Sequence, residues 1–333
     1  MIMTNGLRDK IFSVKSESDF IDLALQQFDY QYNNNPVYHD FSGFLKKVPG
    51  KITRLDELPF LPVEMFKRHR ITTGDLPVQK IFESSGTTGL STSRHYVSDL
   101  SVYEDSFLRS FRFFYGEPSD YFIAALLPSY TERDNSSLVY MADHLINMTG
   151  DALSGFYLEN DDSLIRNIEK RRGEGRKIML LGVTFALLNL AERNHADLSG
   201  AIIMETGGMK GRRPEITRED LHSVLKKAFN IKSVHSEYGM TELLSQAYSK
   251  GDGMFYCPPW MKIILRDTQD PVNLFTEPGR TGGINIIDLA NLYSCSFIST
   301  GDLGRLHPDG GFEVLGRFDN SDIRGCNLLA ESL

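Results

Sequence analysis

The stretch that decides the interpretation of this sequence is Ser84-Ser85-Gly86-Thr87-Thr88-Gly89, between a predicted strand at 78–83 and a predicted helix at 98–114. Glycine lets the backbone approach a ligand closely, and backbone N–H groups in such a turn form an anion-binding nest. The stretch lacks the Gly-Lys-Ser/Thr ending of the P-loop. We therefore interpret it as a phosphate-binding loop of another kind, to which Arg94 or His95 adds positive charge. A plain surface loop is the alternative.

Strands and helices alternate through the middle of the chain. Predicted strands at 121–127, 177–183, 201–205 and 234–238 are separated by predicted helices at 136–148, 184–194 and 218–229. This alternation predicts an α/β fold with a mostly parallel sheet covered by helices on both faces.

The predicted secondary structure changes along the sequence and divides it into four parts. A predicted helix at 18–33, with Ser18 as its cap, indicates an N-terminal helical segment. Short β-like runs separated by Gly/Pro/Asp turns follow residue 255 and predict a β-rich subdomain. The four parts are an N-terminal segment (1–57), an α/β core (58–254), a β-rich subdomain (255–315) and a hinge-like tail (316–333).

Composition excludes several classes of function. The chain has 36 basic and 44 acidic residues, a net charge of −8, and its densest basic stretch, Lys170-Arg171-Arg172, lies between glutamates. We interpret that stretch as a solvated helix end, and we expect neither nucleic acid nor an anionic membrane as the main partner. Three cysteines at spacings that fit no zinc pattern indicate reduced thiols. Because no apolar run is long enough for a membrane span and no signal peptide is evident, we expect a cytoplasmic protein.

Four further motifs follow the loop at 84–89. They are Glu205-Thr206-Gly207-Gly208-Met209-Lys210-Gly211, Ser236-Glu237-Tyr238-Gly239-Met240-Thr241-Glu242, Ser299-Thr300-Gly301-Asp302-Leu303-Gly304 and Gly316-Arg317-Phe318-Asp319. Together with the loop they resemble the adenylate-forming superfamily, which includes acyl-CoA synthetases, peptide-synthetase adenylation domains and luciferases. The finer resemblance is to the acyl-protein synthetases of bacterial luminescence fatty-acid reductases, and then to phenylacetate–CoA ligases.

The resemblance implies a large N-terminal domain that binds ATP and Mg²⁺. The loop holds phosphates, and Gly207 and Gly208 leave bare backbone against which adenine or an acyl chain lies. Taken alone, this glycine pair also suits a tight strand–helix turn. The remaining implied roles are adenine stacking by Tyr238, an α-phosphate contact by Thr241, Mg²⁺ ligation by Glu242, ribose binding by Asp302, and a ribose or phosphate contact by Arg317. Glu237 is a rival acidic residue that we expect to be solvated.

The C-terminal region departs from most of the superfamily. The sequence ends shortly after Arg317, so we expect the small C-terminal domain, with its catalytic lysine, to be absent. The lysine that commonly follows the loop in the superfamily is also missing, and we expect Arg94 to take its place. Cys326 matches the thiol that accepts the acyl group in acyl-protein synthetases, whereas a free cysteine is more commonly a small buried residue. We expect Cys257 and Cys295 to be core residues.

Three functions remain open from the sequence. The first is an acyl-protein synthetase that activates a carboxylic, preferably fatty, acid and serves a partner reductase or acyltransferase. The second is an acyl-CoA or aryl-CoA ligase. The third is a non-catalytic adenylate-binding protein.

Overall fold

A computed structural model describes the chain over residues 2–84, 92–128, 134–157, 161–193, 196–207 and 216–318. Within these ranges, thirteen strands join in one sheet, and five neighbouring strands of that sheet run parallel. In spatial order they are β5 (Gly155–Phe156), β4 (Tyr121–Leu126), β6 (Lys177–Val183), β7 (Ile202–Thr206) and β8 (His235–Tyr238). Every residue of β4 is buried, which explains its unbroken apolar sequence, since parallel strands are covered on both faces.

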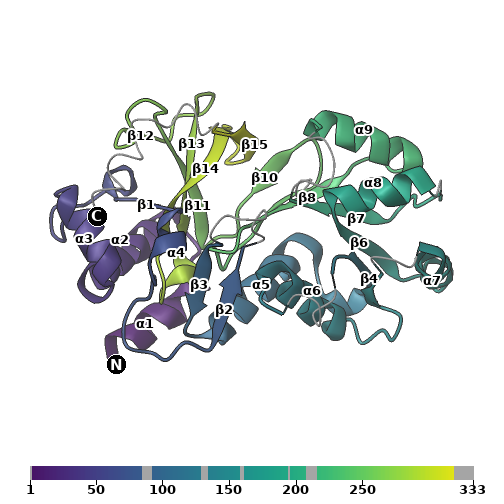
Figure 1. The fold of residues 1–333 in the computed structure, drawn as a ribbon, viewed down its shortest axis with the longest axis horizontal. Helices are drawn as coiled ribbons and strands as arrows, with labels where there is room; N and C mark the ends of the chain where they lie inside the picture. The colour runs from purple at the N-terminus through teal and green to yellow at the C-terminus, as the bar shows by residue number, and fades with distance from the viewer. Residues whose placement is uncertain are drawn as a thin grey trace.

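Helices cover both faces of the parallel half, as the alternation predicted. Figure 1 shows α8 (Thr184–Arg193) and α9 (Arg218–Phe229) on one side of these strands and α5 (Leu100–Tyr115) and α6 (Ser137–Met148) on the other. The basic stretch at 170–172 forms the last turn of α7 (Asp161–Gly173), which confirms its interpretation as a helix end. Parallel strands place their carboxyl ends at one edge, where ligands of such sheets bind.

The sheet continues into an antiparallel half. Its strands, outward from β8, are β9 (Ala247–Ser249), β10 (Met254–Tyr256), β15 (Phe312–Arg317), β14 (Phe297–Leu306), β13 (Thr281–Asp288), β11 (Met261–Arg266) and β12 (Leu274–Phe275). The short β1 (Leu61–Pro62) pairs in parallel with β14. This arrangement brings the residue 300 region close to the end of β8.

N-terminal helices pack against the antiparallel half. They are α1 (Ile2–Ile11), α2 (Glu17–Asn34), α3 (Pro36–Phe44) and, further along, α4 (Met65–Arg68). The buried Gln31 side chain of α2 donates to the main-chain oxygens of Asn291 (2.9 Å) and Leu292 (3.0 Å). These bonds attach α2 to the short 3₁₀ helix η3 (Leu289–Asn291). The 3₁₀ helices η1 (Leu55–Glu57) and η2 (Pro118–Asp120) lie elsewhere in the described part of the chain.

A two-stranded hairpin lies outside the large sheet. It pairs β2 (Lys80–Glu83) antiparallel with β3 (Arg94–Val97). The sequence predicted β2 but not β3, because four residues between a loop and a helix give too short a pattern to recognise.

The predicted N-cap of α2 was wrong. Ser16, not Ser18, accepts a hydrogen bond from the Asp19 N–H at 3.1 Å in a capping box. No helix in the described part of the chain has both the length and the apolar character to cross a membrane.

Candidate nucleotide site

Asp302 lies at the centre of a cluster built from three strands. Its Oδ2 accepts a hydrogen bond from the Tyr238 hydroxyl at 2.8 Å, and its Oδ1 accepts from Arg317 Nε at 3.1 Å. Asp302 and Arg317 are directly opposed on β14 and β15, and Tyr238 ends β8. Three predicted nucleotide residues, distant in sequence, therefore lie in contact.

Charge and burial define what this cluster can do. Burial, reinforced by the Asp302 carboxylate, raises the pKa of Tyr238 well above its usual value, so the phenol remains a neutral donor. Asp302 raises the pKa of Arg317, which remains cationic. The tyrosine ring packs edge-on against Phe255 and Phe312, with centroids 5.9 and 5.7 Å away. The cluster thus presents an oriented carboxylate, a fixed aromatic ring and a cation, which suits a nucleoside.

Thr241 and Glu242 are attached to the β2–β3 hairpin. The Ser93 hydroxyl donates to Glu242 Oε1, and His95 Nδ1 donates to the Thr241 carbonyl oxygen at 2.8 Å. Glu242 is 6% exposed, and burial raises the pKa of its carboxyl group. The hairpin therefore fixes both the side chain of Glu242 and the main chain before it.

His95 does not supply the positive charge expected from the sequence. Burial lowers its pKa to about 4, so the imidazole is neutral near pH 7, and that expectation is wrong. Arg94 is exposed, and its Nε donates to Glu83 at 3.1 Å. Its proposed role toward phosphate stays a prediction.

Ser84, the first residue of the predicted phosphate loop, is bonded to Ser93, four residues beyond the last residue of the loop. The Ser84 N–H donates to the Ser93 carbonyl oxygen at 3.1 Å, and the Ser93 N–H donates to Ser84 Oγ at 3.0 Å. Ser85, Gly86, Thr87, Thr88 and Gly89 lie outside the described residues, as do Gly208 and Cys326.

Glu237, near the end of β8, lies in a different environment from the one expected from the sequence. Thr206 Oγ1 donates to Glu237 Oε2 at 2.8 Å, and desolvation raises the pKa of Glu237 to about 7. The expectation of a solvated Glu237 is therefore wrong. Gly207 follows β7 with φ of +36°, in the left-handed region that favours glycine.

The chemistry of the donor set fits magnesium. Within the described ranges, no three His, Cys, Asp or Glu residues gather into a metal-binding group. Glu242 offers a single carboxylate, which contacts Ser93. Mg²⁺ usually takes one or two protein carboxylates together with substrate phosphates and water, so a lone carboxylate here is compatible with it.

Comparison with solved structures identifies the fold. Similar structures include 2-hydroxyisobutyryl-CoA ligase in the postadenylation state, at 12% identity and a TM-score of 0.64 over 92% of this chain and 69% of that chain. ATP-bound MatB from Rhodopseudomonas palustris has 17% identity and a TM-score of 0.53 over 72% of this chain and 48% of that one. The O-succinylbenzoate coenzyme A synthetase MenE from Bacillus subtilis, with ATP and magnesium, has 19% identity and a TM-score of 0.51 over 74% and 51%. The fold is that of the large domain of adenylate-forming enzymes.

This fold confirms the α/β class predicted from the alternation of strands and helices. The chain spans about half the length of MatB and MenE. No protein-family model and no curated protein matches the sequence.

The sequence did not predict that Ser93 and His95 contact Glu242 and Thr241. Two residues separated by one position lie on the same face of an extended segment. This pattern could have indicated the contacts, but the strand β3 was itself not predicted.

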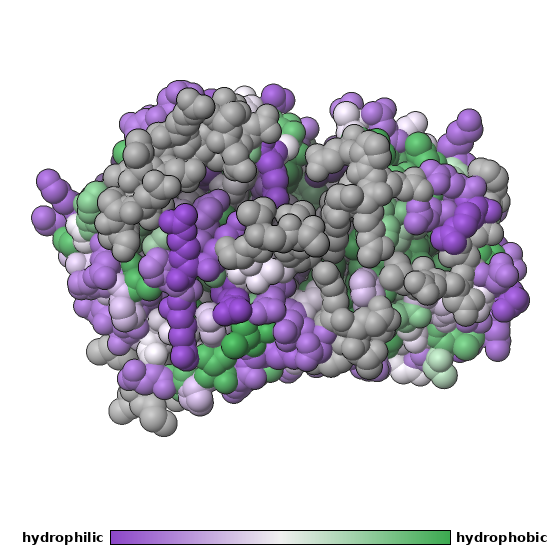
Figure 2. All heavy atoms as spheres, viewed as in Figure 1, coloured by the Kyte–Doolittle hydropathy of each residue, from purple (hydrophilic) through white to green (hydrophobic). Residues whose placement is uncertain are grey.

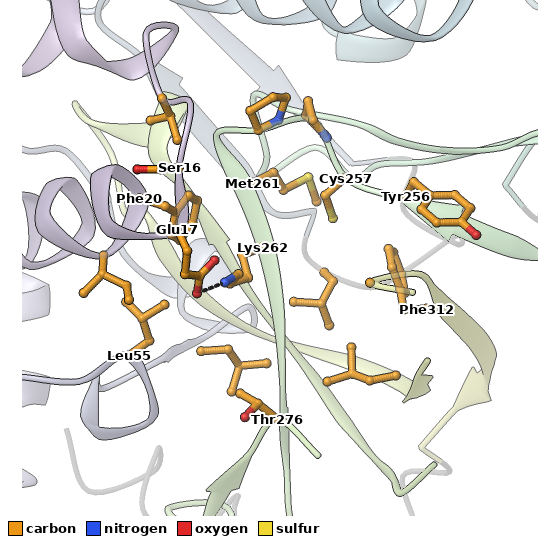
Figure 3. Close-up of a pocket in the computed structure, with 18 of the residues that line it drawn as sticks. Ser16, Glu17, Phe20, Leu55, Tyr256, Cys257, Met261, Lys262, Thr276 and Phe312 are labelled. Carbon is orange, nitrogen blue, oxygen red and sulfur yellow. Dashed lines mark hydrogen bonds and ion pairs between the residues drawn. The ribbon is translucent and has the colours of Figure 1, made fainter. Parts of the chain in front are cut away.

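The two described cysteines differ in environment. Cys295 is fully buried, as expected, and burial raises its pKa to about 12. Cys257 is only half-buried and lines a cavity of about 730 Å³ between α2 and β11, shown in Figure 3. The Glu17–Lys262 ion pair crosses this cavity, and no predicted site residue lines it. Figure 2 shows the mixed polar and apolar surface of the face viewed in Figure 1.

Proposed function

We propose that this protein uses Mg·ATP to activate a carboxylic acid, preferably a fatty acid, as an acyl-adenylate and then transfers the acyl group to a protein thiol. The observation that carries the proposal is the Tyr238–Asp302–Arg317 cluster, because it joins three motifs of the adenylate-forming resemblance in one place. The adenylate-forming fold supports the same chemistry.

In the first step, a carboxylate oxygen of the substrate attacks the α-phosphorus of ATP. A new P–O bond forms, the bond to the bridging oxygen of the β-phosphate breaks, and pyrophosphate leaves. Such a reaction depends chiefly on positioning and charge neutralisation. Asp302 accepts hydrogen bonds from the ribose, Tyr238 orients the base, and Thr241 donates to the α-phosphate.

The remaining groups neutralise charge in that step. The loop at 84–89 and Arg94 bind phosphate oxygens, and Gly207 and Gly208 leave room for the adenylate. Arg317 contributes an exposed cation, and Glu242 is the residue that would hold Mg²⁺, which offsets phosphate charge when bound.

In the second step, the thiolate of Cys326 attacks the acyl carbon. A C–S bond forms, the C–O bond to AMP breaks, and the thiol proton passes to solvent. A partner reductase or acyltransferase then takes the acyl group from the thioester. Thiolates are effective nucleophiles, and Arg324, two residues before Cys326 in the sequence, favours the thiolate form.

Intact-mass analysis after incubation with acid, ATP and Mg²⁺ tests the acceptor. An acyl adduct on the wild type and on Cys257→Ser, lost in Cys326→Ser, is expected. Pyrophosphate without an adduct would assign the acceptor to a partner thiol or to CoA. An added-CoA arm separates these two, and CoA-dependent AMP release would favour the acyl-CoA or aryl-CoA ligase alternative.

A further inference from the structure

Ser93 connects Ser84, the first residue of the predicted phosphate loop, to Glu242, the predicted magnesium ligand. The residue is 1% exposed and lies immediately before β3. Its main-chain N–H and carbonyl oxygen both bond to Ser84, and its hydroxyl donates to Glu242, which lies 149 residues further along the chain. One side chain therefore joins two segments that the sequence separates widely.

The bond restrains a buried carboxylate that also accepts a hydrogen bond from its own main-chain N–H. A glutamate side chain rotates about several bonds, and the buried Glu242 must present a defined oxygen to a metal ion. Carboxylates that bind metals are usually held by outer hydrogen bonds, and loss of such a bond typically costs about 10- to 100-fold in metal affinity. A hydroxyl that donates to Oε1 leaves Oε2 and the remaining lone pairs available for coordination.

The Ser93 hydroxyl donates to Glu242, so Ser93 contributes a hydrogen bond as well as packing. The only proton that the Ser93 side chain offers points toward a carboxylate acceptor, because an ionised carboxylate cannot donate. Hydrogen bonds to a charged acceptor are roughly twice as strong as neutral ones. An alanine at this position keeps most of the packing but loses the whole of this contribution.

We propose that Ser93 is a positioning residue that orients the Glu242 carboxylate toward Mg²⁺. This inference rests on the proposed function, because it assumes that the protein binds Mg·ATP. Ser93 itself contacts neither the substrate nor the reacting atoms. Its effect is confined to the part of ATP affinity that depends on magnesium.

Calorimetric titration of ATP, once with Mg²⁺ and once with EDTA, tests the inference through binding rather than activity. Wild type is expected to bind ATP more tightly with Mg²⁺. Ser93→Ala is expected to weaken binding roughly 10-fold with Mg²⁺ and to leave binding in EDTA unchanged. Ser93→Thr, which keeps the hydroxyl, is expected to restore the magnesium effect.

Matched variants keep the test decisive. Ser110→Ala removes another buried hydroxyl, one for which the described structure provides no hydrogen-bond partner, and is expected to match wild type in both titrations. If Ser93→Ala does not fold, Ser93→Cys keeps the size of the side chain with a weaker donor and is expected to lose part of the magnesium effect.

Two results would overturn the inference while leaving the proposed function intact. One is an unchanged magnesium effect in Ser93→Ala, and the other is an equal loss of affinity with Mg²⁺ and with EDTA, which would mean that Ser93 only shapes the hairpin. Absence of ATP binding by wild type would instead remove the proposed function, and the inference with it.

Discussion

Asp302 and Arg317 are opposed on neighbouring strands and share an ion pair, yet the arginine side chain is 83% exposed and the carboxylate only 8%. The carboxylate is therefore held by the sheet, while the guanidinium reaches into solvent from the last residue of β15. Because water screens the exposed guanidinium, we expect this pair to contribute little more than a surface ion pair, which commonly contributes about 0–1 kcal/mol. We therefore expect Arg317 to act mainly by contacting the ligand and not by stabilising the fold.

Arg317→Ala should separate these two contributions. We expect a change in unfolding free energy of about 1 kcal/mol or less, because the arginine side chain is exposed, and a fall in ATP-dependent turnover of at least about 10-fold, because a charge-assisted contact is lost. Chemical denaturation and a pyrophosphate-release assay measure the two quantities. A large loss of stability with unchanged turnover would assign Arg317 a structural role.

Asp302→Asn keeps the shape of the side chain but removes its charge. Hydrogen bonds to a charged group contribute about 1.5–3 kcal/mol, so ATP affinity should fall roughly 10- to 100-fold. Calorimetric titration measures this, with Asp270→Asn, an exposed residue of a turn, as the control. Wild-type affinity in Asp302→Asn would exclude this carboxylate from nucleotide binding.

Glu237 should make stability depend on pH. Because its pKa rises from 4.5 to about 7 in the folded protein, the folded state binds more protons than the unfolded state between these values. Stability from this group is complete below about pH 4.5 and declines as pH rises through 7.

Glu237→Gln should therefore be more stable than wild type at pH 8.5, by roughly 1–3 kcal/mol, and should gain little at pH 5. Urea denaturation at both pH values checks this. Glu277→Gln, an exposed carboxylate, should change neither value, and a stability difference for Glu237→Gln that is independent of pH would argue against a raised pKa.

Gln31→Leu should destabilise the attachment of α2 to the sheet. The substitution leaves the Ser296 N–H and the Leu292 carbonyl without the partner that Gln31 provides, and each unpaired buried group costs about 1–3 kcal/mol. We expect a loss of about 2–5 kcal/mol in unfolding free energy by denaturant titration, against Gln26→Leu as an exposed control on the same helix. A loss below about 0.5 kcal/mol would contradict the buried network.

Regular elements with a clear period could be predicted from the sequence. The bounds 177–183 for β6 and 218–229 for α9 agree with the structure because each is a long, uninterrupted pattern. The helix α3 was not predicted, because Asn35 and Pro36 favour both a turn and a helix start; in the structure Asn35 caps the helix. Side-chain character depends on distant neighbours, as Glu237 and His95 show, and the Ser93–Glu242 bond spans a separation that no local pattern reveals.

Acid-dependent release of pyrophosphate from ATP tests the central claim most directly. The assay compares wild type with Asp302→Asn across a panel of short, long-chain and aromatic carboxylic acids, with Mg²⁺ present. We predict release that requires both an acid and Mg²⁺, is fastest with a fatty acid, and falls at least about 10-fold in Asp302→Asn. No acid-dependent release from the wild type, despite measurable ATP binding, would contradict adenylate formation and favour a non-catalytic adenylate-binding protein.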